Sequence, residues 1–336
     1  MTKLFTRTAI ALALVTSVTV VLAAKRKNQS QRDLAGFGSK HEFVDQGETR
    51  TYYVARPKNE PEKRKLPTAF CFHGGGGNLE GLRPIVLRLQ DAGFQVITPL
   101  GLDGHWNDGR LTKKHAEQDR TIDDTAFVQR IIERTPTIDR TRVYAYGVSN
   151  GGMLTHRLGI EKRQLFTAIA SVAAPLPKVQ QAWRSTPHGE PLPLLFIMGT
   201  DDPWLPFNGG KVVTNMAPRL FSNDRDWGQG EVQSADETIN FWLKKNGLTS
   251  MAAGEADIQD LDPLDGCKAV RKSWAMQNRP VLQYIEVTGG GHTVPGAEYP
   301  EGQAAWLERV FGKTCRDFNT GDELVRFFKQ HPRDSE

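Results

Sequence analysis

Short apolar runs alternate with amphipathic stretches along most of this sequence, and this alternation restricts the fold more than any other feature. Strands are predicted at 51–54, 66–72, 94–99, 143–148, 168–173, 194–198 and 281–287, and helices at 79–92, 119–134, 150–159, 235–245 and 322–330. Apolar strands that are joined by helices form a parallel sheet with both faces covered. The prediction is an α/β fold whose ligand site lies beyond the carboxyl ends of the strands. The interval 202–280 is long, and apart from its helix we expect irregular loops and a partial cap there.

A serine lies at the end of one predicted strand, in a context that is typical of a nucleophile. The strand 143–148 leads into Gly147-Val148-Ser149-Asn150-Gly151, which fits the pattern G-x-S-x-G, and a helix is predicted directly after it. A serine at such a sharp turn needs glycine two residues before and after it, because larger side chains would collide. The amino terminus of the helix also stabilises negative charge that develops beside the serine. Ser149 is therefore the candidate nucleophile, and the motif is typical of the α/β-hydrolase fold.

A run of glycines follows the strand 66–72, in the sequence His73-Gly74-Gly75-Gly76-Gly77-Asn78. In this fold, that loop and the residue after the nucleophile each supply a backbone N–H to an oxyanion. Asn150 is the second donor, and the sequence leaves Gly75 and Gly76 open as the first. A phosphate-binding loop is the weaker alternative, because the run lacks the Lys-Ser/Thr pair and the dinucleotide spacing. His73 is predicted to order the loop.

Two further strand ends carry the remaining chemistry. The strand 194–198 is followed by Asp201 and Asp202, either of which can hold an imidazole in its useful tautomer; the alternative for each is an ordinary turn residue. The last strand ends in a glycine-rich loop that carries His292, the candidate general base. The order serine, aspartate, histidine is the one that this fold requires.

The remaining histidines are predicted to be surface or structural residues: His41, His105, His115, His156, His188 and His331. No group of residues has metal-ligand spacing, so the sequence predicts neither a metal nor another cofactor. Cys71 lies in an apolar run and is interpreted as a small buried hydrophobe. Cys267 and Cys315 could pair if the protein is exported, and the sequence leaves that open.

The first 24 residues have the composition of a secretory signal peptide. Lys3 and Arg7 precede an apolar run at 10–24 that ends in small residues. The run has about 15 residues where a membrane span needs about 20, so an uncleaved anchor is the weaker alternative, although four basic residues at 25–32 disfavour translocation. We expect a secreted or periplasmic protein with no stable membrane span. A flexible leader is predicted over 25–40 and a catalytic domain over 41–336.

Charge argues against a nucleic-acid partner. The net charge of the chain is +4, and removal of Lys3 and Arg7 with the signal peptide would leave about +2 (4 − 2). No stripe of basic residues interleaved with aromatics is present in the sequence. The expected partner is therefore a small or polymeric substrate.

Five motifs together resemble the secreted polyhydroxybutyrate depolymerase and feruloyl esterase-like family: HGGGGN, DGHWNDGR, GVSNGG, GTDDPWLPFNGG and GGGHTVPG. The resemblance extends from about Phe43 to His331. It implies that the acid is Asp202 and that Trp106 lies near the site as a substrate-binding residue; core packing is the alternative for Trp106. It also implies a structural role for the pair Asp123 and Asp124.

Two features depart from the pattern of this family. Val294 stands where the family usually has tryptophan after His-Thr, which puts a preference for aromatic substrates in doubt. The segment 300–315 is longer than usual, so the rim of the pocket is expected to differ.

The sequence as a whole predicts a serine ester hydrolase that works through an acyl-enzyme, with Ser149, Asp202 and His292 as its triad. Its expected substrates are hydroxyalkanoate, feruloyl or acetyl esters. Two alternatives remain. A serine peptidase of this fold usually adds a large propeller domain, for which this chain leaves no room. A binding protein on a hydrolase scaffold tends to lose a member of the triad, and here all three are present.

Overall fold

The computed structural model describes residues 34–110, 122–179, 190–213, 230–248, 254–299, 302 and 304–333. The predicted signal peptide and residues 25–33 of the predicted leader lie outside these ranges. The fold begins before residue 41, because Leu34–Phe37 form a 3₁₀ helix, the Phe37 side chain is fully buried and the first strand starts at Ser39. The leader predicted over 25–40 is therefore wrong from residue 34 onward. Within the described ranges, none of the helices combines the length and hydropathy that a membrane crossing needs.

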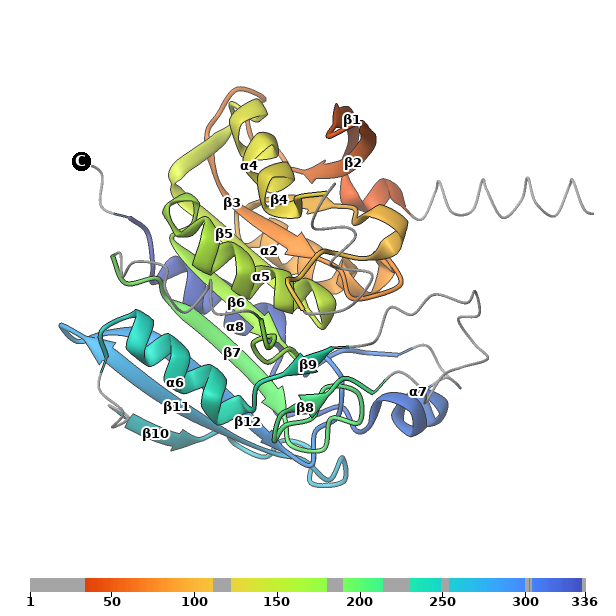
Figure 1. Cartoon of the computed structure of the whole chain (residues 1–336), viewed down its shortest axis with the longest axis vertical. Helices are drawn as coiled ribbons and strands as arrows, with labels where there is room; N and C mark the ends of the chain where they lie inside the picture. Colours follow the sequence, from red (N-terminus) through yellow and green to blue (C-terminus); the bar gives the residue numbers. More distant parts are fainter. Residues whose placement is uncertain are drawn as a thin grey trace, which may run out of the picture.

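Within the described residues, a sheet of ten strands forms the centre of the molecule (Figure 1). Its order is β1 (Ser39–Asp45), β2 (Glu48–Ala55), β4 (Gln95–Pro99), β3 (Leu66–Phe72), β5 (Ile138–Val148), β6 (Ala168–Val172), β7 (Leu194–Gly199), β12 (Arg279–Thr288), β11 (Lys268–Met276) and β10 (Gly254–Asp257). The strands from β4 to β12 in this order are parallel, while the two strands at each edge pair antiparallel. The predicted parallel sheet is confirmed.

Helices cover both faces of the sheet. On one face lie α4 (Asp124–Arg134), α5 (Asn150–Glu161) and α6 (Ala235–Lys245), which Figure 1 shows in front. On the other lie α2 (Arg83–Asp91) and α8 (Thr320–Lys329). Two separate clusters of buried apolar side chains result, one with Phe127, Leu154 and Trp242 and the other with Val86 and Phe328. Each sheet face is therefore buried against its own helices, which explains why the parallel strands are apolar on both sides.

Two predicted helices start later than expected. The helix predicted from 119 begins at Asp124, and Asp123 caps it by accepting hydrogen bonds from the backbone N–H groups of Thr125 and Ala126. Residues 111–121 lie outside the described ranges. The helix predicted from 79 begins as a 3₁₀ turn at Glu80–Leu82, and α2 starts at Arg83, where proline occupies the first turn.

The prediction of irregular loops over 202–280 is wrong in part. Besides α6, this interval contains the short strands β8 (Gly210–Lys211) and β9 (Glu231–Val232), and the sheet strands β10 and β11. A tight turn joins β11 to β12, with positive φ angles of 51° at Gln277 and 63° at Asn278. Two successive left-handed residues are the signature of a type I′ hairpin, whose twist matches that of the strands.

The order of the strands decides where the site lies. β3 lies between β4 and β5, so the chain moves from β3 first to one side of the sheet and then to the other. Ligands bind at such a switch point, outside the carboxyl ends of the strands. The carboxyl ends of β3, β5, β7 and β12 lie along this edge, and each is followed by one of the candidate site residues.

Candidate active site

Ser149 lies on a strained turn between β5 and α5. Its φ and ψ are 56° and −124°, a conformation that costs free energy for any residue with a side chain and that recurs at functional sites. A Cβ atom on Gly147 would come within 2.1 Å of the Gly151 carbonyl oxygen, and one on Gly151 within 2.4 Å of the Phe72 carbonyl oxygen. A Cβ atom on Gly152 would lie 2.6 Å from that of Ala174. Gly147 and Gly151 are therefore required by close backbone packing, as the motif predicted, and Gly152 by the Ala174 side chain.

The structure brings the three predicted triad residues together. Nε2 of His292 lies 2.9 Å from Oγ of Ser149, and Nδ1 of His292 lies 2.7 Å from Oδ2 of Asp202. The carboxylate can only accept, so Nδ1 carries the proton and Nε2 presents its lone pair to the serine hydroxyl. This is the arrangement in which an imidazole can take a proton from a serine.

Asp202 and Asp201 have different surroundings. The Asp202 side chain is fully buried, and its Oδ1 accepts hydrogen bonds of 2.8 Å from the backbone N–H groups of Trp204 and Leu205. Asp201 is exposed, and its Oδ1 accepts from the hydroxyl of the neighbouring Thr200. Of the two aspartates that position alone left open, Asp202 is the one that contacts His292.

The glycine loop after β3 runs across the nucleophile. A Cβ atom on Gly74 would lie 3.3 Å from that of Ser149. The N–H of Gly76 donates to the Gly104 carbonyl at 3.0 Å, so it is already engaged. This contact argues against Gly76 and leaves Gly75 as the candidate donor in the loop, beside Asn150 at the start of α5.

His73 orders this loop, as predicted. Its Nε2 accepts from the Gly101 N–H at 3.0 Å, so its Nδ1 is the protonated nitrogen and donates to the Gly74 carbonyl at 2.7 Å. Burial lowers the pKa of His73 to about 4, although the bond to Gly74 opposes that shift. The ring is therefore neutral near pH 7, and its two hydrogen bonds fasten the glycine loop to the segment that follows β4.

Trp106 is not a substrate-binding residue in this structure, and that prediction is wrong. Its side chain is fully buried, its indole N–H donates to the His73 carbonyl at 3.0 Å, and it packs edge-on against Phe72 with 5.5 Å between ring centroids. The residue lies beneath the glycine loop. Core packing, the alternative that the sequence had left open, describes it.

The same WNDGR segment fixes the residue that follows the nucleophile. The Asn150 side chain accepts from the Trp106 N–H at 2.8 Å and donates to Oδ2 of Asp108 at 2.6 Å. Asp108 in turn forms a buried ion pair of 2.9 Å with Arg110. Sequence reasoning singled out this motif but missed Asp108 and Arg110, because only the folded chain brings 106–110 against the start of α5.

The pair Asp123 and Asp124 is structural, as predicted. Asp123 caps α4. Asp124 forms a buried ion pair of 2.6 Å with Arg50 and accepts from the Asn107 N–H at 2.7 Å. Burial raises the pKa of Asp124, while the Arg50 guanidinium acts in the opposite direction. The pair thus connects β2, the WNDGR segment and α4.

Aromatic rings lie beside the histidine, and sequence reasoning missed them. The Trp204 ring is parallel to that of His292, with 5.9 Å between centroids, and stacks on Phe311 at 5.2 Å. The Trp204 indole N–H donates to the Val310 carbonyl at 2.9 Å, which fixes the ring. Trp204 and Phe311 therefore place aromatic rings beside His292, although Val294 itself is not aromatic.

Two of the other histidines lie in the interior or beside the glycine loop. His156 is buried and structural, because its Nε2 donates to the Ala174 carbonyl and its Nδ1 accepts from the Trp242 indole, each at 3.0 Å. Its burial lowers its pKa to about 4. His105 lies beside the glycine loop, where a Cβ atom on Gly75 would be 3.0 Å from its Nε2. His115 and His188 lie outside the described residues.

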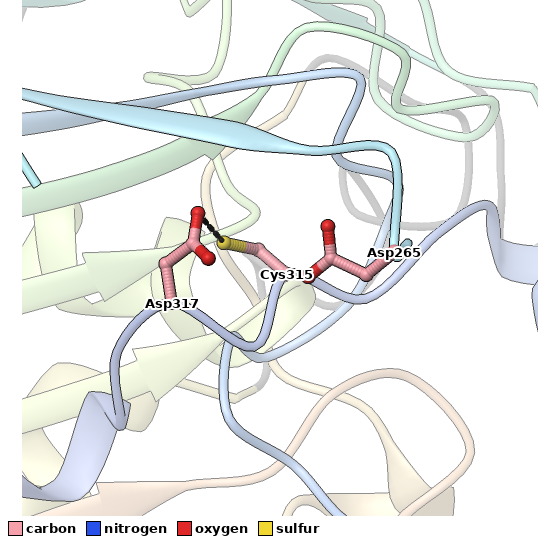
Figure 2. A group of neighbouring side chains, drawn as sticks. All are labelled: Asp265, Cys315 and Asp317. Carbon is pink, nitrogen blue, oxygen red and sulfur yellow. Dashed lines mark hydrogen bonds between the residues drawn. The ribbon is translucent and has the colours of Figure 1, made fainter. Parts of the chain in front are cut away.

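One group of potential metal ligands occurs among the described residues, and none of its members belongs to the triad (Figure 2). Ligand atoms of Asp265, Cys315 and Asp317 lie within 4.8 Å of one another. Both carboxylates already accept hydrogen bonds from backbone N–H groups. Cys71, Cys267 and Cys315 are free and buried, so the disulfide that the sequence left open is not formed in this structure.

Comparison with known proteins places this geometry in context. The model of the prolyl oligopeptidase family matches residues 105–192, about a quarter of the chain, which include the WNDGR segment and the serine turn. The chain is 28% identical to "Putative esterase NocK" of Nocardia uniformis subsp. tsuyamanensis over 292 residues, which cover 85% of this chain and 81% of that protein. It is 25% identical over 174 residues to "Feruloyl esterase B" of Piromyces equi, which cover 51% of this chain and 29% of that protein.

Among solved structures, the acetyl xylan esterase from Aspergillus awamori superposes with a TM-score of 0.56 at 17% identity. The match covers 87% of this chain and all of that one. At this identity the likeness concerns the fold alone. The chain has the α/β-hydrolase fold, as predicted, with a large and mostly parallel central sheet.

Proposed function

We propose that this protein is a serine hydrolase of carboxylic esters. The observation that supports the proposal best is the hydrogen-bonded series from Ser149 through His292 to Asp202, at 2.9 and 2.7 Å, with the serine on a strained turn. The named esterases among its relatives support ester substrates.

The reaction proceeds through an acyl-enzyme. As Oγ of Ser149 attacks the ester carbonyl carbon, its proton passes to Nε2 of His292, and the oxyanion accepts hydrogen bonds from the N–H groups of Asn150 and Gly75. The C–O bond to the alcohol breaks, and the alcohol leaves with the proton from His292. Water then attacks the acyl carbon and gives one proton to His292. The bond between the acyl carbon and Oγ breaks, the acid leaves, and Oγ of Ser149 takes that proton back from His292. Asp202 stabilises the imidazolium in both halves.

The proposed acyl groups are hydroxyalkanoate, feruloyl or acetyl. The relative named a feruloyl esterase supports the second, and so do Trp204 and Phe311, whose rings offer an aromatic surface beside His292. We also propose that residues 1–24 direct export to the periplasm or medium, on the composition of that segment.

A serine peptidase is the second candidate, because the prolyl oligopeptidase family model matches the region around the nucleophile. The two activities are separated by assaying a short-chain nitrophenyl ester, methyl ferulate, hydroxybutyrate oligomers and a proline-containing peptide nitroanilide. Ester turnover that disappears in Ser149→Ala, with no release of nitroaniline, supports the ester hydrolase. Turnover of the peptide alone would move the assignment to a peptidase, and turnover of neither class would refute both.

A further inference from the structure

Two segments distant in the sequence are fastened side by side at the end of β12. The carboxylate of Asp265 accepts from the Cys267 N–H through Oδ1 and from the Arg316 N–H through Oδ2, each at 2.7 Å. A Cβ atom on Gly266 would lie 2.3 Å from the Lys313 ammonium nitrogen. The residues that lead into β11 therefore lie against those that follow α7 (Ala304–Phe311).

Each of these segments contributes one buried cysteine to the contact. The side chains are only 3% exposed for Cys267 and 1% exposed for Cys315, and both belong to the same cluster of buried side chains. Figure 2 shows the Cys315 sulfur directed toward Asp317, whose Oδ2 lies 3.5 Å away. Two buried thiols in one cluster, on backbones held by one carboxylate, meet the first requirement for a disulfide, which is that the chain need not move far to form it.

We propose that Cys267 and Cys315 are a disulfide-forming pair that is oxidised when the protein folds outside the cytoplasm. One cysteine, as its thiolate, attacks an oxidant of the disulfide class, such as glutathione disulfide or an exported thiol–disulfide oxidoreductase, and displaces one of its sulfurs as a thiol. The second cysteine attacks the mixed disulfide and displaces the other. The pair loses two electrons and two protons, and the oxidant is reduced to two thiols.

The burial of the two thiols determines when the disulfide can form. Both side chains are almost fully buried, so an external oxidant has little access to them, and the neighbouring Cys267 thiol and burial both raise the pKa of the Cys315 thiol. A buried, protonated thiol reacts slowly with an external oxidant. Oxidation therefore takes place during folding, before the segment around Cys315 packs, and the finished bond is shielded from reductants.

A metal ion is the competing use of this cluster, since Asp265 and Asp317 lie near Cys315. Both Asp265 oxygens and Oδ1 of Asp317 already accept from backbone N–H groups, the last from Leu261 at 2.9 Å. A metal would have to replace these bonds, which fasten the two segments. A disulfide leaves them intact.

The pair stands directly behind the loop that carries His292. The Lys313 carbonyl accepts from the Gly291 N–H at 2.8 Å and from the Thr293 hydroxyl at 3.1 Å, and the Cys315 carbonyl accepts from the Gly296 N–H at 2.8 Å. A covalent bond at Cys315 would therefore restrain the strand-like segment on which this loop rests. We expect it to protect activity against heat and to leave turnover at room temperature little changed.

The test refolds the reduced, purified chain in a mixture of reduced and oxidised glutathione, and then counts thiols in denaturant with a chelator present. We expect one thiol, that of Cys71, and three after reduction. In Cys71→Ala the expected counts are zero and two. Three thiols after refolding, with or without zinc found by elemental analysis of the folded protein, would overturn the proposal. Because the oxidant is supplied in the buffer, the result does not depend on whether residues 1–24 direct export.

A double variant tests the effect of the disulfide on thermal stability. Cys267→Ser/Cys315→Ser is expected to lower Tm by roughly 5–10 °C relative to the oxidised protein, since the bond would close a loop of about 50 residues. Initial ester hydrolysis should stay within about twofold. An unchanged Tm on reduction of the Cys71→Ala protein would contradict the restraint, and this measurement stands even if the double variant fails to fold.

Discussion

Replacing Asp202 with asparagine isolates what the buried carboxylate does, because the two side chains have the same shape. Oδ1 of Asp202 accepts from two backbone N–H groups, and Oδ2 faces Nδ1 of His292. In Asp202→Asn, the amide oxygen must take the position of Oδ1, since an NH₂ group there would face two donors. The NH₂ group then points at His292. It forces Nδ1 to accept and puts the imidazole proton on Nε2, where it opposes Ser149.

This wrong tautomer determines how far kcat should fall. An imidazole that holds its proton on Nε2 cannot accept one from Ser149, and the equivalent change in a serine protease triad lowers kcat about 10⁴-fold. This corresponds to about 5.4 kcal/mol of transition-state stabilisation. Substrate binding does not use the carboxylate, so KM should change by less than about threefold.

The assay is steady-state hydrolysis of a short-chain nitrophenyl ester, with Asp201→Asn as the matched control. Asp201 is the exposed neighbour of Asp202, and its replacement should leave kcat within about twofold. Circular dichroism and thermal unfolding establish that both variants fold. If Asp202→Asn kept more than a tenth of wild-type kcat, or if both variants lost activity equally, the tautomer argument would be refuted.

Three further predictions address the turn, the aromatic surface and the buried histidines. Gly151→Ala should lower kcat at least 100-fold and destabilise the fold, because its Cβ atom would lie 2.4 Å from a β3 carbonyl oxygen. Gly81→Ala is the control: a Cβ atom there would meet no atom within 4 Å, so neither kcat nor stability should fall in the same assays. Trp204→Ala should lower kcat/KM for methyl ferulate about tenfold more than for a short aliphatic ester; an equal loss on both substrates would mean that the ring only positions His292. His73 and His156 have pKa values lowered to about 4, so between pH 6.5 and about 4 the unfolded chain binds protons that the folded chain does not. The free energy of unfolding therefore decreases as the pH is lowered through this range, by up to roughly 3 kcal/mol for each histidine. Urea unfolding at pH 7 and pH 5 measures this, and equal stabilities would contradict the lowered pKa values.

Local rules fixed much of the fold in advance. Periodicity predicted the parallel strands and the helices between them, because each element must bury an apolar face. The turn at Ser149 was predictable because it requires glycine two residues before and after the serine. The structure confirms that a Cβ atom at either position would collide with the backbone. Boundaries were less predictable: Asp123, a helix cap, was assigned to the helix interior.

The edges of the sheet could not be predicted in the same way. β1 and β11 are held by pairing with β2 and β12, and half-exposed strands carry a weaker apolar pattern than buried ones. Their tight turns depend on left-handed residues such as Gln277, which few sequence patterns signal.

The sequence by itself therefore determined the α/β architecture, the turn at Ser149 and the order in which serine, aspartate and histidine follow strands. These depend on contacts within a few residues or on the period of burial. Tertiary structure decided that Asp202 reaches His292 while Asp201 faces solvent, that the Gly76 N–H is engaged, and that Trp106 lies beneath the loop. Each of these depends on which atoms from distant segments occupy the same few ångströms, and spacing along the chain carries no record of that.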